Sequence, residues 1–246
     1  LLVLDEAHAM WETTSVFRGK WQFDIPALRT MLQERGNTSP VLSLSATMSA
    51  NLRMSHATAL RLVDPVTISS DPDRRNVFMT TRPKGPLQAD VASMVREFEA
   101  ARQRLGTSIQ ALIYTRTKSD AENLTRAWRN QSSIPVGTIT GGKKSKQQAQ
   151  AQEALQQSWA KFEVPVIVAT SAFTLGIDGR KCALVFRRGS PKNLTEMAQD
   201  LGRAARGRDI QGQYVVYWAS GDRNIHELLM ATSSEEEQER VRKELA

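Results

Sequence analysis

Cysteine occurs only once in the 246 residues, at Cys182. A single thiol excludes an internal disulfide framework and any zinc site built from four cysteines. Long apolar runs are also missing, because no stretch approaches the roughly 18–20 residues that span a bilayer. We therefore expect no membrane partner. No secretory signal is visible, but a chain whose first residues already form a strand could not display one.

Anionic side chains are the minority. The chain has 33 lysines and arginines against 26 aspartates and glutamates, a formal net charge of +7. This surplus favours a polyanionic partner, although a basic surface can also serve solubility alone. With 40% hydrophobic and 24% charged residues, the composition is typical of a soluble globular protein, and the length allows one large or two medium domains.

The first eight residues combine an apolar run with carboxylates. Leu1 to Leu4 predict a strand buried on both faces, as in a parallel α/β sheet. Asp5, Glu6 and His8 follow at once. In nucleotide hydrolases a carboxylate in this place holds Mg²⁺, and a second one can polarise the attacking water. A strand followed by an ordinary polar turn is the alternative for so short a motif.

A polar, proline-containing stretch at 69–76 predicts a domain boundary. Before it we expect, in order, a strand at 1–4, a helix at 26–35, a strand at 41–44, a helix at 51–62 and a strand at 66–68. Beyond it, helices alternate with strands at 111–114, 134–139, 164–169, 183–186 and 214–218. This alternation predicts a parallel sheet with helices on both faces. Ser119 and Glu122 have the spacing of a helix capping box.

Four motifs occur in a fixed order: D-E-A-H at 5–8, S-A-T at 45–47, A-T-S-A-F with G-I-D at 169–178, and Q-D-L-G-R-A-A-R at 199–206. In this order and spacing the chain resembles a superfamily 2 helicase from motif II to motif VI, and RecQ helicases within it. D-R-R-N at 73–76 stands where RecQ proteins carry D-R-P-N. Phe17-Arg18 follows the D-E-A-H box at the distance of the F-R pair in the RecQ aromatic-rich loop.

The resemblance implies two RecA-like α/β domains with parallel sheets flanked by helices, and ATP in the cleft between them. The first domain, at 1–70, would be incomplete at its N-terminus; the second would span 71–222, and a charged helical tail 223–246. The implied activity is ATP-dependent 3′–5′ unwinding of DNA, with ATP and Mg²⁺ as cofactors. A D-E-A-H RNA helicase is disfavoured by D-R-R-N and the A-T-S-A-F form.

The resemblance also assigns nucleotide residues. Asp5 would coordinate Mg²⁺, and Glu6 would orient the hydrolytic water. Arg203 and Arg206 would act as arginine fingers, and their spacing would put both on one helical face; a solvated surface helix is the alternative. The remaining nucleotide-binding positions are His8, Gly176, Asp178 and Gln199.

Expected nucleic-acid contacts fall in three groups. Trp11, Phe17 and Arg18 suit stacking on bases and holding phosphates, although a loop anchored by its aromatics is an equal alternative. Ser45 and Thr47 would transmit the nucleotide state to DNA. The last group lies at strand carboxyl ends, where backbone amides, hydroxyls and cations can follow phosphates without reading sequence: Arg116, Thr117, Gly142, Lys143 and Thr170. For the lysine, a solvated loop is the alternative.

Some positions depart from the RecQ pattern. Arg187 occupies a common histidine position, Asp200 replaces glutamate, and the 246 residues contain no Walker A loop of the form G-x-x-x-x-G-K-[ST]. A non-catalytic nucleic-acid-binding remnant is therefore the competing hypothesis. The expected partner is DNA, as single strands and duplex junctions, bound without sequence preference, in a nucleus or a bacterial nucleoid. The sequence does not identify protein partners.

Overall fold

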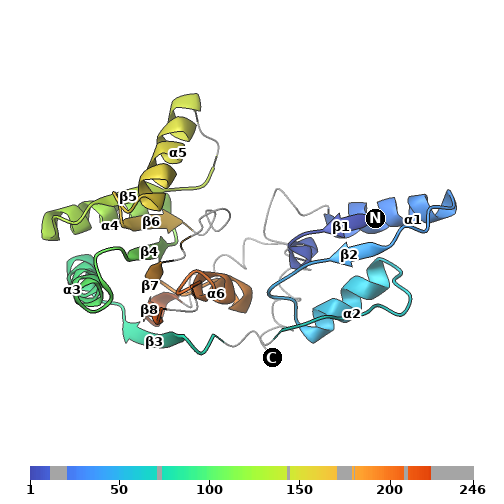
Figure 1. The fold of residues 1–246 in the computed structure, drawn as a ribbon, viewed down its shortest axis with the longest axis horizontal. Coiled ribbons are helices and arrows are strands. Elements are labelled where there is room, and N and C mark those ends of the chain that lie inside the picture. The colour runs from blue at the N-terminus through green and yellow to red at the C-terminus, as the bar shows by residue number, and fades with distance from the viewer. Residues whose placement is uncertain are drawn as a thin grey trace. The chain divides into compact units, whose positions relative to one another are not determined.

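The computed structural model describes residues 1–11, 21–70, 74–142, 145–170, 179, 181–207 and 210–222. The chain divides ahead of Arg74 into two compact units (Figure 1). Several residues discussed above lie outside the described ones: Phe17, Arg18, Lys143, Gly176, Asp178 and the tail at 223–246. In the described part of the chain, no helix has the length and apolar character needed to cross a membrane.

The first unit contains a small parallel sheet. Strand β1 (Leu2–Leu4) pairs in parallel with β2 (Val41–Ser43). A 3₁₀ turn, η1 (Ala7–Met10), follows β1, and two helices complete the unit: α1 (Trp21–Glu34) and α2 (Ala50–Ala59). Helix α2 begins after Ser49, whose hydroxyl accepts a hydrogen bond from the Leu52 amide. Such a cap satisfies one of the free amides of the first turn.

Three expectations for this unit need correction. The first strand is not buried on both faces, since Val3 is 50% exposed; among the described residues of this unit, β1 and β2 pair only with each other. The strand expected at 66–68 is absent, and Ile68 is 94% exposed, because an apolar run gains nothing as a strand without a neighbour to pair with. Helix α1 begins at Trp21 and contains Pro26 in its interior.

The second unit is built on a six-stranded sheet in which every paired strand runs parallel. In spatial order the strands are β3 (Val77–Pro83), β8 (Gly212–Trp218), β7 (Cys182–Arg188), β4 (Gln110–Thr115), β6 (Val166–Thr170) and β5 (Val136–Ile139). The predicted parallel sheet is therefore confirmed. Strand β3 was not expected from the sequence, and it lies at the edge of the sheet.

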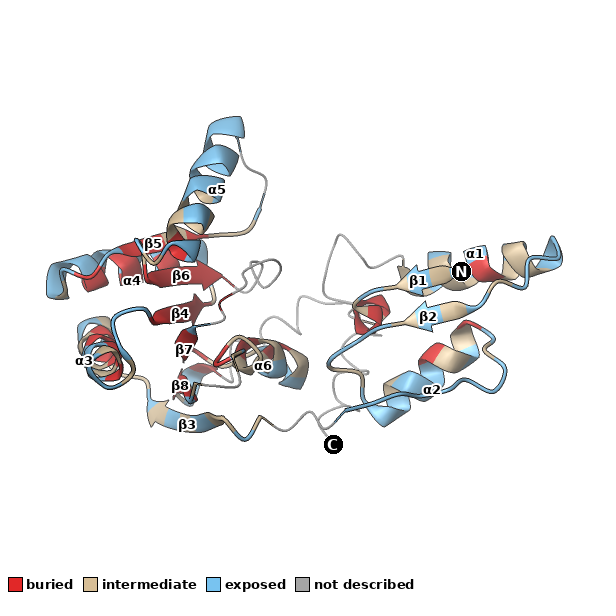
Figure 2. Ribbon diagram, in the orientation of Figure 1, coloured by how far each residue is buried: buried red, intermediate tan, exposed pale blue. Residues whose placement is uncertain are grey.

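Four helices cover the two faces of this sheet: α3 (Leu87–Leu105), α4 (Lys118–Gln131), α5 (Lys146–Ala160) and α6 (Leu194–Leu201). Side chains of α3 and α4 share one apolar cluster with alternate residues of the strands, and those of α5 and α6 share the other. The sheet is thus buried between two helical layers (Figure 2). Phe98 and Trp128, with ring centroids 6.2 Å apart, join α3 to α4.

The N-terminal cap of α4 also differs from the expectation. The cap is Thr117, whose hydroxyl oxygen accepts a hydrogen bond from the Asp120 amide at 3.0 Å, and the expected capping box at Ser119 does not form. The helix starts earlier because β4 ends at Thr115 and leaves a two-residue connection. This short connection places Arg116 and Thr117 at the carboxyl edge of the sheet.

Candidate nucleotide and nucleic-acid site

The D-E-A-H residues form a tight turn directly after β1. Glu6 adopts a left-handed backbone conformation, with φ of 51°, and its amide donates a hydrogen bond to Oδ1 of Asp5 at 2.9 Å. The next amide, of Ala7, donates to the carbonyl of Leu44 just beyond β2. A non-glycine residue in this conformation is strained by about 1–2 kcal/mol, and such strain is concentrated at functional turns. The turn leaves Asp5 exposed and Glu6 half-buried.

His8 joins this turn to the S-A-T segment. Its side chain is buried, and Nδ1 lies 2.9 Å from Oγ of Ser45 and 3.3 Å from Oε2 of Glu6. The amide of Thr47 donates to the same Ser45 hydroxyl at 3.3 Å. The structure therefore brings Glu6 and His8 together with Ser45 and Thr47, although His8 and Ser45 are 37 positions apart in the sequence. His8 therefore contacts one residue in each of the two segments.

Asp5 and Glu6 present carboxylate oxygens of the kind that Mg²⁺ takes as ligands. Magnesium in nucleotide sites is held by one or two carboxylates together with substrate phosphates and water. The described residues contain no cluster of three or more potential metal-binding side chains. The two carboxylates at the end of β1 fit a Mg²⁺ ion that takes its remaining ligands from phosphate and water.

In the second unit, the candidate DNA contacts gather at the carboxyl ends of parallel strands. Arg116 and Thr117 follow β4, Gly142 follows β5, and Thr170 ends β6. Thr170 is buried, and its hydroxyl accepts a hydrogen bond from the Gly141 amide at 3.1 Å. This bond ties the segment after β5 to the end of β6. Thr170 thus acts as a brace for the edge, whereas Thr117 and Gly142 are exposed.

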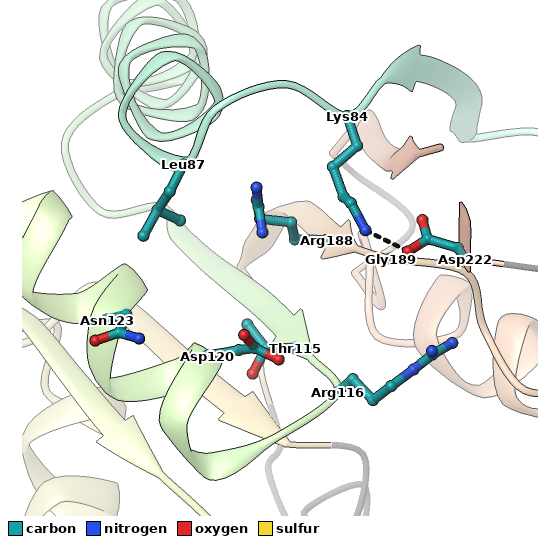
Figure 3. Close-up of a pocket in the computed structure, with 9 residues that line it drawn as sticks. All are labelled: Lys84, Leu87, Thr115, Arg116, Asp120, Asn123, Arg188, Gly189 and Asp222. Carbon is teal, nitrogen blue, oxygen red and sulfur yellow. Dashed lines mark hydrogen bonds and ion pairs between the residues drawn. The ribbon is translucent and has the colours of Figure 1, made fainter. Parts of the chain in front are cut away.

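A pocket opens at this edge and contains cations that sequence reasoning missed. Lys84 forms an ion pair with Asp222, and Arg188 donates from Nε to Oδ2 of Asp90 at 2.8 Å. Figure 3 shows both cations around the pocket with Arg116. The pocket lining is Lys84, Leu87, Thr115, Arg116, Asp120, Asn123, Arg188, Gly189 and Asp222. These residues come from four separate stretches of the unit's sequence, so no local motif marks them.

The two motif VI arginines do not lie on a helix. Helix α6 ends at Leu201, and residues 202–205 form turns, so the expected shared helical face is wrong. Arg203 is half-buried and Arg206 exposed. Gly202 caps the helix, and a Cβ there would come within 3.1 Å of the Ala198 carbonyl. Gln199 lies on α6 itself, half-buried.

Comparisons with known proteins bear on this arrangement. Residues 94–208 match the family described as the helicase conserved C-terminal domain. The chain is 29% identical over 233 residues to the bifunctional 3′-5′ exonuclease/ATP-dependent helicase WRN of Mus musculus. It is also 26% identical over 247 residues to the ATP-dependent DNA helicase RecQ of Synechocystis. The matches cover 94% and 95% of this chain.

The chain is similar to RecQ-family helicases over most of its length. It spans 16% of the length of the WRN protein and 48% of the length of Synechocystis RecQ. Solved structures show what fold the chain has. Mss116p bound to single-stranded RNA and AMP-PNP matches with a TM-score of 0.66 at 18% identity, over 92% of this chain and 45% of that one. Mycobacterium smegmatis Lhr, bound to single-stranded DNA and AMP-PNP, matches with a TM-score of 0.62 at 21% identity, over 89% of this chain and 29% of that one. These likenesses show the RecA-like helicase fold.

Proposed function

We propose that this chain carries the hydrolytic and DNA-contacting residues of an ATP-dependent 3′–5′ DNA helicase of RecQ type. The observation that carries the proposal is the turn after β1, where His8 Nδ1 lies within 3.3 Å of both Glu6 and Ser45. A hydrolase needs a water-orienting carboxylate, and a motor needs that carboxylate coupled to the rest of the protein. This turn offers both in one set of contacts.

Each unit contributes to nucleotide chemistry in this proposal. Asp5 would hold Mg²⁺, which supplies neutralisation of phosphate charge when bound. Glu6 would orient and polarise the attacking water. Arg203 and Arg206 would stabilise the negative charge that develops on the transferred phosphoryl group, an effect of roughly 10³–10⁵ in rate for arginine fingers. Gln199, Gly176 and Asp178 are assigned to the same nucleotide on family resemblance.

DNA contacts would be made through the sugar–phosphate backbone. The residues assigned to strand carboxyl ends, with Arg116 and Lys143 as the cations, would hold phosphates without reading bases. Trp11, Phe17 and Arg18 would add stacking and charge. The partner is proposed to be single-stranded DNA and its junctions with duplex, in the nucleus or the nucleoid.

DNA-stimulated ATP hydrolysis tests the proposal. The 246-residue chain contains no Walker A loop, so we expect it alone to hydrolyse ATP at a negligible rate. A longer protein, in which a segment with that loop precedes Leu1, should hydrolyse ATP faster in the presence of single-stranded DNA and displace a strand from a 3′-tailed duplex. DNA binding without any turnover in the longer protein would instead support the competing function, a non-catalytic nucleic-acid-binding protein.

A further inference from the structure

The turn that carries Arg203 and Arg206 has an unusual backbone. Ala204 and Ala205, which lie between the two arginines, are fully buried. Ala205 has a left-handed conformation with φ of 45°, which a residue with a side chain seldom adopts. A strained, buried conformation persists only where several contacts with the surrounding structure hold it in place. Groups from elsewhere in the unit must therefore hold this turn.

Two side chains from the residues just ahead of β3 bind its carbonyl oxygens. Arg74 donates from one nitrogen, Nη2, to the carbonyl of Ala204 at 2.9 Å and to that of Ala205 at 2.8 Å. Asn76 donates from Nδ2 to the Ala205 carbonyl at 2.9 Å and to the Ile210 carbonyl at 3.2 Å. These contacts join residues about 130 positions apart in the chain.

The side chains of Arg74 and Asn76 thus form a clamp on the carbonyls of this turn. Backbone hydrogen bonds at the starts of the neighbouring strands hold the clamp and the turn in place. The amide of Gly212, at the start of β8, donates to the carbonyl of Asn76, and the amide of Val77 donates to that of Arg74. The Ala205 amide donates to the carbonyl of Cys182, at the start of β7, at 2.7 Å. The turn is thus held by backbone on one side and by a guanidinium and an amide on the other.

We propose that Arg74 and Asn76 are positioning residues that fix this turn and thereby set the direction of Arg203 and Arg206. The inference rests on the proposed function, in which the two arginines act on the nucleotide phosphates. Rotation of the peptide planes at Ala204 and Ala205 would redirect the arginines on either side of them. Because both carbonyls are buried, losing their donors leaves unsatisfied acceptors, and the turn must change to recover hydrogen bonds.

Amide hydrogen exchange of the 246-residue chain tests the clamp directly. In Arg74→Ala we expect exchange at the Ala204 and Ala205 amides to accelerate at least about tenfold, while the β4 amides keep the parent rate. In Arg74→Lys the exchange rates of these amides should lie between those of the parent and of Arg74→Ala, since an ammonium is a point donor without the planar fork of a guanidinium. Arg126→Ala, at an exposed position of α4, is the arginine control and should leave the turn unchanged.

Steady-state kinetics of the longer protein with a Walker A loop tests the consequence. Arg74→Ala should lower kcat for ATP about 10²-fold with KM changed less than about threefold, the signature of misplaced groups that act in the transition state. Asn76→Ala should act in the same direction, and Arg126→Ala should keep the parent kcat. A mere loss of stability would lower the thermal midpoint without this split.

Several results would overturn the proposal. Unchanged exchange at Ala204 and Ala205 in Arg74→Ala would show that the clamp does not hold the turn. A loss of kcat in Arg126→Ala equal to that in Arg74→Ala would remove the specificity of the effect. If Arg74→Ala does not fold, the comparison of Arg74→Lys with the parent decides alone. Absence of ATPase activity in the longer parent protein would overturn the proposed function. The exchange rates of the 246-residue chain would still show whether Arg74 and Asn76 hold the turn.

Discussion

Arg187 on β7 donates a hydrogen bond from Nε to Oδ2 of Asp200 on α6, and both side chains are buried. Around this pair, Arg187 Nη2 lies 3.2 Å from Oε1 of Glu196, and the Tyr214 hydroxyl donates to Asp200 at 3.2 Å. The guanidinium carbon stands 5.5 Å from the ring centroid of Tyr114. Arg187 and Asp200 are two positions at which this chain departs from the RecQ pattern, and here the two departures meet in one contact.

This contact predicts a large loss of stability when Arg187 is replaced. Arg187→Met would leave two buried carboxylates, of Asp200 and Glu196, without their guanidinium. Breaking a buried ion pair by removal of one partner costs about 3–5 kcal/mol. Denaturant unfolding at pH 7 should show a loss of that order, whereas Arg126→Ala, at an exposed position of α4, should stay within about 0.5 kcal/mol of the parent. Equal stability of Arg187→Met and the parent would contradict the structural role of the pair.

The same cluster predicts a pH dependence. Burial raises the pKa of Asp200 to about 6, and the nearby Glu196 carboxylate acts in the same direction, while Arg187 and the Tyr214 hydroxyl oppose it. Its Oδ1 atom accepts no hydrogen bond from the described part of the chain. An unfolded aspartate has a pKa of about 3.9, so between about pH 4 and 6 the folded protein binds one proton more than the unfolded chain does at this residue. The contribution of Asp200 to stability should therefore grow as the pH falls from 7 to 5.

Denaturant unfolding of the parent and of Asp200→Asn across pH 5–7 measures this contribution. The free energy of unfolding of the parent minus that of the variant should rise on acidification, by about 1.4 kcal/mol for each unit of pKa difference that is titrated. Subtraction of the variant removes the titration of other groups. A difference that falls with decreasing pH would mean that Asp200 has a lowered pKa and is held as a carboxylate.

Much of the second unit's fold could be predicted from its sequence. The central strands β4, β6 and β7 are nearly continuous apolar runs, because a parallel strand between two helical layers is buried on both faces. Strand β3 was not predicted because it lies at the sheet edge, where one side of the strand is unpaired. Phe78 is 67% exposed, and the strand ends in Thr, Arg and Pro. Its pattern matches neither a buried run nor a regular alternation.

The candidate site could be predicted only where its chemistry is local. Asp5, Glu6 and His8 lie within four consecutive residues, so their motif can be recognised from the sequence alone. The helical face expected for Arg203 and Arg206 was wrong because α6 ends at Leu201, and the contacts that shape the following turn come from Arg74 and Asn76. Contacts of such long range leave no periodicity in the sequence.

Limited proteolysis should separate the two units. The second unit contains two apolar clusters on the two faces of its sheet, whereas the buried apolar residues of the first unit, among those described, are Ala7, Ala9, Met10 and Leu60. A two-stranded sheet with exposed apolar residues is marginal alone. We expect the first cuts within residues 1–68, with a fragment containing 77–220 persisting longer. Earlier cutting within 77–220 would contradict this order.

DNA binding by the chain should be weak, salt-sensitive and nearly independent of sequence. On single-stranded DNA, each cation that neutralises a phosphate contributes about −0.7 to the slope of log K against log salt. Arg116→Ala should therefore weaken binding of a single-stranded oligonucleotide and flatten that slope by about 0.7, whereas Arg126→Ala serves as the cation-matched control. Fluorescence anisotropy across a salt series measures both. A slope near zero for the parent would exclude phosphate contacts as the source of affinity.

The last prediction concerns Glu6 in the longer protein that carries a Walker A loop. Glu6→Gln keeps the size of the side chain and a hydrogen-bonding oxygen, but it removes the charge that orients and polarises water. Turnover should fall below detection, while ATP affinity, which the phosphate grip and Asp5 supply, should stay within a few-fold of the parent. Arg206→Ala should likewise lower kcat more than it weakens ATP binding, since a finger acts mainly on transition-state charge. Rapid-quench hydrolysis and equilibrium binding of a fluorescent ATP analogue separate the two quantities. Parent-rate hydrolysis by Glu6→Gln would show that the turn after β1 is not the hydrolytic centre, and the helicase function built on it would fail.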